Sequence, residues 1–257
     1  MLLCIDESGN TSNLIALGLT AIPAPGVEPL SQIFTLRPTD PYEVKTLYQR
    51  DPDANRPGHM PTPRKEFKYS DFLNAERATG LPVYRKFLKE KLAEASRLPI
   101  RTYCSLFDKP ESNDKRLNIL RIEANTLLLL WGTQNVQDAL RPTLNITVDR
   151  QVFPEEMLFQ VYERRNQFHV EVFPTKSISK KVYYGGRENE KLVRERSSRD
   201  FKPLQFTDFV VGAIREAHLF GRTDMLDVLK PILREENIRD ARGEYKFQKG
   251  FRFTKTK

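Results

Sequence analysis

The sequence predicts an α/β protein built on a mixed sheet, and three observations support that class. The chain begins with three short strand-like segments, and helices and strands then alternate along it. Its 257 residues, 39% of them hydrophobic, are enough for one large core. The longest apolar run, Leu127 to Trp131, is far too short to span a membrane. We therefore expect a sheet with helices on its faces and no membrane partner.

The first part of the chain predicts a hairpin, an insertion and a helix. Leu2–Ile5 and Leu14–Ala21 are apolar runs separated by the turn-forming residues SGNTSN, which predicts a hairpin. Residues 23–63 hold nine of the seventeen prolines, so we expect an irregular insertion there. The segment EFKYSDF, residues 66–72, predicts a third short strand or a strand-to-helix junction. Apolar residues at helical spacing predict a helix over residues 79–96.

Strands and helices alternate in the rest of the chain. Ile100–Phe107 predicts a strand, and a helix follows from an Asn113 cap to about Leu140, where Pro142 stops it. The remaining expected elements are a strand Leu144–Asp149, a short helix Phe153–Arg165, a strand His169–Phe173 and an amphipathic helix Pro203–Phe220. This order is that of ribonuclease H-like folds with added elements. We expect that domain to span residues 1–220, with a C-terminal helix and a basic, aromatic tail over 221–257.

The charge of the chain favours a polyanionic partner. The formal net charge is +8, and residues 175–202 hold nine Lys or Arg against four Asp or Glu. We expect a basic loop there that contacts nucleic acid, with candidate contacts at Lys180, Lys181, Arg194 and Arg196. A solvated loop with no partner is the alternative interpretation. The oligomeric state is not predicted.

The cysteine and histidine content indicates the compartment and excludes a zinc centre. Cys4 and Cys104 lie in apolar strand-like runs, so they are expected to be buried free thiols in the reducing cytoplasm. The three histidines are scattered and form no zinc-ligand spacing.

Three aspartates occupy similar positions in the predicted elements. Asp6 ends the first strand, Asp149 ends the strand LNITVD, and Asp208 is a polar position in the apolar helix LQFTDFVVGA. A carboxylate at the border of a packed face needs a cation as a partner. Convergent carboxylates are the oxygen ligands that Mg²⁺ or Mn²⁺ prefers. A lone aspartate at a strand end is more often a turn or cap residue, so the prediction rests on the three converging.

Four motifs in order resemble the family described as domain of unknown function 3800. They are IDESGN at the N-terminus, EFKYSD in the middle, NITVDRQ after the long helix, and PLQFTDFVVGAI near the end. The resemblance spans most of residues 1–220 and implies a ribonuclease H-like fold with a divalent-metal, nuclease-like site. By motif, it implies functional roles for Asp6, Glu7, Asp149 and Asp208. In the middle motif, both Glu66 and Lys68 match.

The identity of a fourth acid stays open among three residues. Alternation along a strand points Asp6 and Glu7 to opposite faces unless the strand has already broken. Glu66 is offered by the middle motif, and Asp108 ends the strand after the first helix. Lys68 is a candidate contact for the scissile phosphate, as a point charge.

Two functions fit these residues. The first is a metal-dependent nuclease, a hydrolase in which metal-bound water attacks a phosphodiester. The second is a non-catalytic nucleic-acid-binding module with the same fold. Clustered carboxylates separate the two, because they repel phosphate and serve a binding-only module poorly. An ATP-binding, actin-like protein would need a duplicated glycine-rich phosphate loop, which the sequence lacks.

Overall fold

The computed structural model describes most of the chain, in segments. These are residues 1–9, 14–49, 66–108, 111–135, 138, 144–149, 157–164, 167–174, 191–196, 201–233, 237–240, 243–246 and 251–254. Of the candidate nucleic-acid contacts, Lys180 and Lys181 lie outside the described residues.

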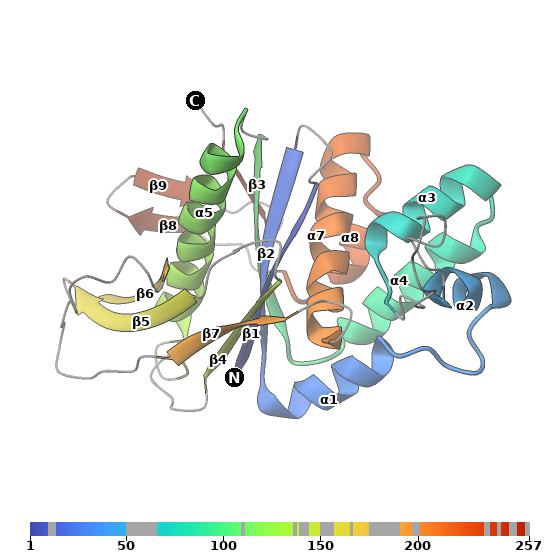
Figure 1. The fold of residues 1–257 in the computed structure, drawn as a ribbon, viewed down its shortest axis with the longest axis horizontal. Helices are drawn as coiled ribbons and strands as arrows, with labels where there is room; N and C mark the ends of the chain where they lie inside the picture. The colour runs from blue at the N-terminus through green and yellow to red at the C-terminus, as the bar shows by residue number, and fades with distance from the viewer. Residues whose placement is uncertain are drawn as a thin grey trace, which may run out of the picture.

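The described strands form one eight-stranded mixed sheet and a separate two-stranded sheet (Figure 1). The order across the large sheet is β10-β3-β2-β1-β4-β7-β5-β6. Its strands are β1 (Leu2–Ser8), β2 (Leu14–Ile22), β3 (Arg101–Asp108), β4 (Asn145–Asp149), β5 (Met157–Arg164), β6 (Gln167–Pro174), β7 (Lys191–Arg196) and β10 (Phe251–Thr254). The small sheet pairs β8 (Asn237–Asp240) with β9 (Gly243–Lys246).

The direction of the central strands decides which ends meet. β1 pairs antiparallel with β2, and β2 pairs antiparallel with β3. On its other side β1 pairs parallel with β4, and β4 pairs parallel with β7. The carboxyl ends of β1, β4 and β7 therefore lie along one edge of the sheet, the edge where open α/β sheets bind ligands.

Helices cover both faces of the sheet. One face carries α1 (Ala24–Ile33), α2 (Tyr42–Gln49), α3 (Tyr69–Thr79), α4 (Val83–Ala95), α7 (Lys202–Phe220) and α8 (Asp224–Leu229). The other face carries α5 (Asn113–Gln134), and Figure 1 shows α5 and α7 on opposite sides of β1 and β2. The expected mixed sheet with flanking helices is confirmed in this form.

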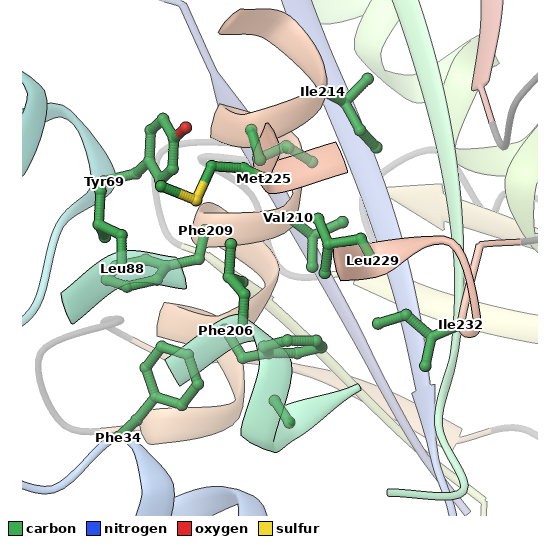
Figure 2. Close-up of a cluster of buried hydrophobic side chains, with 14 of the residues drawn as sticks. Phe34, Tyr69, Leu88, Phe206, Phe209, Val210, Ile214, Met225, Leu229 and Ile232 are labelled. Carbon is green, nitrogen blue, oxygen red and sulfur yellow. The ribbon is translucent and has the colours of Figure 1, made fainter. Parts of the chain in front are cut away.

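Alternation along the strands divides the core in two. Leu2 and Cys4 of β1 point into the cluster under α7, whereas Leu3 and Ile5 point into the cluster under α5. Aromatic rings fill the α7 side, where Phe34 and Phe209 contact edge to face with centroids 5.0 Å apart (Figure 2). Both cysteine thiols are free and buried, as expected.

The hairpin predicted at the N-terminus is confirmed over β1 and β2. Gly9, in the turn that follows β1, has φ +112°, a backbone conformation that side-chain-bearing residues rarely adopt. A Cβ at Gly9 would also lie 2.3 Å from the carbonyl oxygen of Leu14. The glycine of the IDESG motif is therefore required by the backbone.

The prediction of an irregular insertion over residues 23–63 is wrong where the structure describes it. Residues 24–33 form α1 and residues 42–49 form α2, because apolar side chains such as Leu30 and Val44 are buried in the core. Proline lies in the first turn of α1, where its missing N–H has no helical partner to lose. Residues 50–65 lie outside the described segments.

The helix expected over residues 79–96 is in fact preceded by a second helix. α3 ends at Thr79 and is capped by Gly80, whose φ of +68° is left-handed, and α4 begins at Val83. Residues 66–68 enter α3 from extended backbone at Lys68, so the junction interpretation of EFKYSDF is the correct one. The N-cap of α5 is Ser112, whose Oγ accepts from the N–H of Lys115, and not the expected Asn113.

Strand pairing overrides local signals at two further places. The helix expected over Phe153–Arg165 is the strand β5, which pairs with β6 over eight registered positions. The basic loop expected over residues 175–202 contains the strand β7, which is paired on both sides. The remainder of that stretch, apart from Phe201 and Lys202, lies outside the described segments.

The chain after residue 220 also packs on the sheet. Met225 and Leu229 of α8 are buried in the α7-side core, and β10 adds to the edge beside β3. Across the described segments, no helix has both the length and the apolarity needed to cross a bilayer.

Candidate functional site

Asp6 and Asp149 lie side by side on one face of the sheet. The parallel register pairs Ile5 with Val148, so the next positions along β1 and β4 are Asp6 and Asp149. Cys4 points toward α7 and Val148 points toward α5, so alternation directs both aspartates toward α7. Both are buried, with exposures of 6% and 8%.

Glu7 points to the opposite face of β1. The strand continues through Ser8, so alternation is maintained at this position. The Glu7 carboxylate forms an ion pair with Arg116 of α5, the helix that covers the other face. Asp108, at the end of β3, is partly buried and pairs in register with Leu14 of β2, four positions along that strand from Gly18, the register partner of Asp6. The structure therefore groups neither Glu7 nor Asp108 with Asp6 and Asp149.

Asp208 reaches the same face from α7. Its Oδ2 accepts a hydrogen bond of 3.0 Å from the backbone N–H of Tyr69, the first residue of α3. The preceding segment is tied to α7 as well, because the N–H of Phe67 donates to Gln205 Oε1 at 3.3 Å. This arrangement brings buried Glu66 and partly exposed Lys68 next to Asp208, with Lys68 Nζ 3.9 Å from Glu66 Oε1.

The acids repel one another in this arrangement. Burial raises the pKa of Asp6 well above its usual range, and the negative charges of Asp149 and Asp208 raise it further. Burial likewise raises the pKa of Asp208 to about 6, and the negative charges of Glu66 and Asp149 contribute to this increase. Lys68 lowers the pKa of both groups, so its ammonium acts on the same cluster. These four acids and one lysine form a single electrostatic unit, which we call the acid cluster.

Tyr69 holds Asp208 in place along one stripe of α7. Asp208, Gly212 and Glu216 are spaced four residues apart and so lie on one face of the helix. The backbone N–H of Tyr69 donates to Asp208, and its hydroxyl donates to Glu216. Its ring packs directly against Gly212, so closely that a Cβ added there would lie 2.4 Å from the ring. Sequence reasoning missed this role, although the stripe is visible as Asp, Gly and Glu at helical spacing.

Glu216 is also the centre of a buried ion-pair network. Arg85 of α4 bonds Glu216 at 3.0 Å and also pairs with Asp224 of α8. The exposure of the Glu216 side chain is only 1%. Three helices thereby fix the position of the stripe that carries Asp208, which rigidly supports one side of the acid cluster.

One of the candidate nucleic-acid contacts lies beside the acid cluster. Arg196 ends β7 and pairs in register with Asp149 of β4, so it points to the same face. It is exposed, and its guanidinium carbon lies 4.7 Å from the ring centroid of Phe201. Arg194 lies on the same strand two residues earlier.

Among the described residues, no group of three or more His, Cys, Asp or Glu side chains is arranged so that it could hold a metal ion as it stands. The acids of the cluster interact electrostatically, but their side chains do not surround a common point as the ligands of a metal ion would. Comparisons of the chain with protein-family models, curated proteins and solved structures found no match. The class of protein that the fold and site define is an α/β protein with a carboxylate-rich edge on its mixed sheet.

The raised pKa of Asp208 predicts a pH-dependent stability. Its pKa is about 6 in the fold against an ordinary value of 3.8, so the folded state binds more protons between these values. The free energy of unfolding should therefore fall as the pH rises from about 4 to about 6. Because the side chain is partly exposed, we expect a loss below about 2 kcal/mol.

Other acids require a control variant for this measurement. Arg85 lowers the pKa of Asp224, which contributes in the opposite direction at lower pH. We therefore expect the stability of Asp208→Asn relative to the unmodified chain to increase from pH 4 to pH 6, measured by urea unfolding in EDTA. A difference that stays constant over this interval would contradict the assignment.

Proposed function

We propose that this protein is a divalent-metal-dependent nuclease with a ribonuclease H-like fold. The observation that carries the proposal is the convergence of Asp6, Asp149 and Asp208 from two parallel strands and a helix, with mutual repulsion that raises the pKa of Asp6. Buried like charges are costly, and a protein tolerates them where a cation binds. Glu66 is the best supported fourth acid because it acts on Asp208.

The donor set suits Mg²⁺ or Mn²⁺. Carboxylate oxygens are the hard ligands that these ions prefer, whereas zinc favours thiolate and imidazole groups. When bound, such ions supply an activated water and stabilise the leaving oxygen of a phosphodiester. Asp6, Asp149 and Asp208 would hold the ions.

Lys68 has two roles in this proposal. Its ammonium offsets the charges of Glu66, Asp6 and Asp208 in the protein without metal. A bound cation would take over that offset, and Lys68 would then contact a substrate phosphate as a point charge. Its side chain is 30% exposed, so it can reach substrate.

The strand arrangement supports the ribonuclease H-like classification. A three-stranded antiparallel meander, β1 to β3, continues through β1 into the parallel strands β4 and β7. The four motifs that resemble domain of unknown function 3800 all border the acid cluster: β1 with its turn, the segment before α3, the end of β4, and α7. The proposal of membership in that family rests on these residues.

A non-catalytic nucleic-acid-binding module is the second candidate. The exposed Arg196 and the positive net charge favour it equally. The acid cluster does not, because buried carboxylates beside the binding face repel the phosphates that such a module must attract.

Metal-induced stabilisation tests the proposal directly. We expect millimolar Mn²⁺ to raise the melting temperature of the protein relative to EDTA, because ions that bind only the folded state stabilise it. Cleavage of labelled single- and double-stranded DNA and RNA should appear with Mn²⁺ or Mg²⁺ and vanish in EDTA. Nucleic-acid binding without any metal-dependent cleavage or melting shift would instead support the binding module.

A further inference from the structure

Two cation–aromatic pairs meet at the start of α7. Arg196 stacks on Phe201 with 4.7 Å between the guanidinium carbon and the ring centroid. Lys202, the next residue after Phe201, places its Nζ 5.3 Å from the ring centroid of Tyr48 and donates to the Tyr48 hydroxyl at 3.1 Å. The first pair lies on the described end of β7, and the second joins α7 to α2.

Both pairs adjoin the acid cluster. Arg196 is the register partner of Asp149. The ring centroids of Tyr48 and Phe67 lie 4.6 Å apart, and Phe67 is the residue between Glu66 and Lys68. A chain of phosphates that crossed the acid cluster would therefore meet a basic, aromatic pair next to Asp149 and another next to Glu66.

We propose that these pairs, Arg196 on Phe201 and Lys202 on Tyr48, form a binding platform for single-stranded nucleic acid. The inference rests on the proposed function, because the platform would deliver a strand to the acid cluster. It specifies the substrate as a strand with unpaired bases.

The geometry of Arg196 favours a single strand over a duplex. The Arg196 guanidinium lies over the ring of Phe201, and Arg196 is exposed, so the guanidinium is supported by the ring and accessible from solvent. An open guanidinium plane stacks on bases, and only unpaired bases present their faces to it. A contact to phosphate alone would need the charge without the flat, preorganised plane. Lys202, the residue that follows Phe201, is held by Tyr48 and supplies a phosphate contact.

The test compares charge-conserving and charge-removing variants. Affinities for a labelled single-stranded oligothymidine and for a duplex of equal length are measured by fluorescence anisotropy in EDTA, where no cleavage can occur. Arg196→Lys keeps the charge and loses the plane, so single-strand affinity should fall about tenfold while duplex affinity changes less than about twofold. Lys202→Gln should reduce the salt slope of single-strand binding by about 0.7.

Lys230→Gln is the matched control for lost charge. Lys230 is exposed and directly follows α8, and the chain just beyond it bridges through Leu233 to Thr102 at the start of β3. β3 runs in the same direction as β1, so this is the end of the sheet away from Asp6. Lys230→Gln should leave the affinities for the single strand and for the duplex unchanged.

Each result decides the inference separately from the nuclease proposal. Unaltered single-strand affinity in Arg196→Lys, or a duplex bound as tightly as the single strand, overturns the platform. Absence of binding to either probe also overturns it. Tight, Arg196-dependent single-strand binding in a protein that never cleaves with Mn²⁺ supports the platform and refutes the nuclease.

Discussion

Asp6→Asn should abolish metal-dependent cleavage while the protein remains folded. Asparagine keeps the size of aspartate and can still accept the 2.8 Å hydrogen bond from the N–H of Glu7. It lacks the negative charge that holds a divalent cation. Groups that merely support a metal ligand cost 10–100-fold when removed, so we expect a loss of at least about 100-fold in cleavage rate.

The same change should stabilise the metal-free protein. The carboxylate of Asp6 is buried and repelled by Asp149 and Asp208, so its removal relieves a cost of folding above the ordinary pKa of aspartate. We expect a higher melting temperature in EDTA at pH 7 and a smaller shift on addition of Mn²⁺. Both are measured by thermal melting with and without the ion.

Asp227→Asn provides the matched control. Asp227 is an aspartate on α8 whose side chain is 53% exposed, and it forms an ion pair with Lys230 at the end of the same helix. The same chemical change there should leave cleavage and the Mn²⁺ shift intact. If Asp6→Asn cleaves at the rate of the unmodified chain and keeps the full Mn²⁺ shift, Asp6 is a strand-end turn residue and the site is elsewhere.

Gly212→Ala should be the most destabilising small substitution in α7. A Cβ at Gly212 would lie 2.4, 2.5 and 2.9 Å from atoms of the Tyr69 side chain. Tyr69 cannot move aside easily, because its N–H is bonded to Asp208 and its hydroxyl to Glu216. Overpacking of this kind costs about 1–3 kcal/mol. The displaced Tyr69 should also release Asp208, so cleavage should fall together with stability.

Gly26→Ala is the control for a glycine in a helix. A Cβ at Gly26 of α1 would meet only ordinary contacts, at 3.5 Å from Ile22 and 3.9 Å from Ile100. The helix preference for alanine should then stabilise the protein by about 0.5–1 kcal/mol. Chemical denaturation of both variants measures the contrast. A neutral Gly212→Ala would show that Tyr69 does not hold the stripe as described.

The sequence by itself determined the strands, helices and acids whose signals are local. The apolar runs around SGN predicted the hairpin β1–β2, and the run LNITVD predicted β4 with Asp149 at its end. The amphipathic pattern after Pro203 predicted α7 with its buried face. These succeed because apolar periodicity and turn residues act within a few positions of the chain.

Predictions failed where distant pairing outweighs local preference. Residues 157–164 form a strand because β6 and β7 pair with them on either side. A short stretch of sequence does not contain the strands with which it will pair. Likewise α1 persists through Pro29 because its apolar side chains are covered by the core of the α7 face. Propensity is a weak term beside such burial.

Only the tertiary structure decided how the candidate acids are grouped. Strand alternation alone did not decide whether Glu7 is a ligand. In the structure β1 continues past Glu7, and Glu7 pairs with Arg116 of α5 on the opposite face of the sheet. Glu66 and Lys68 join Asp208 because the N–H groups of Phe67 and Tyr69 fasten their segment to α7, across more than 130 positions of the chain. Spatial convergence depends on strand direction and helix docking, and both arise from long-range burial of apolar surface that acts on the whole chain at once.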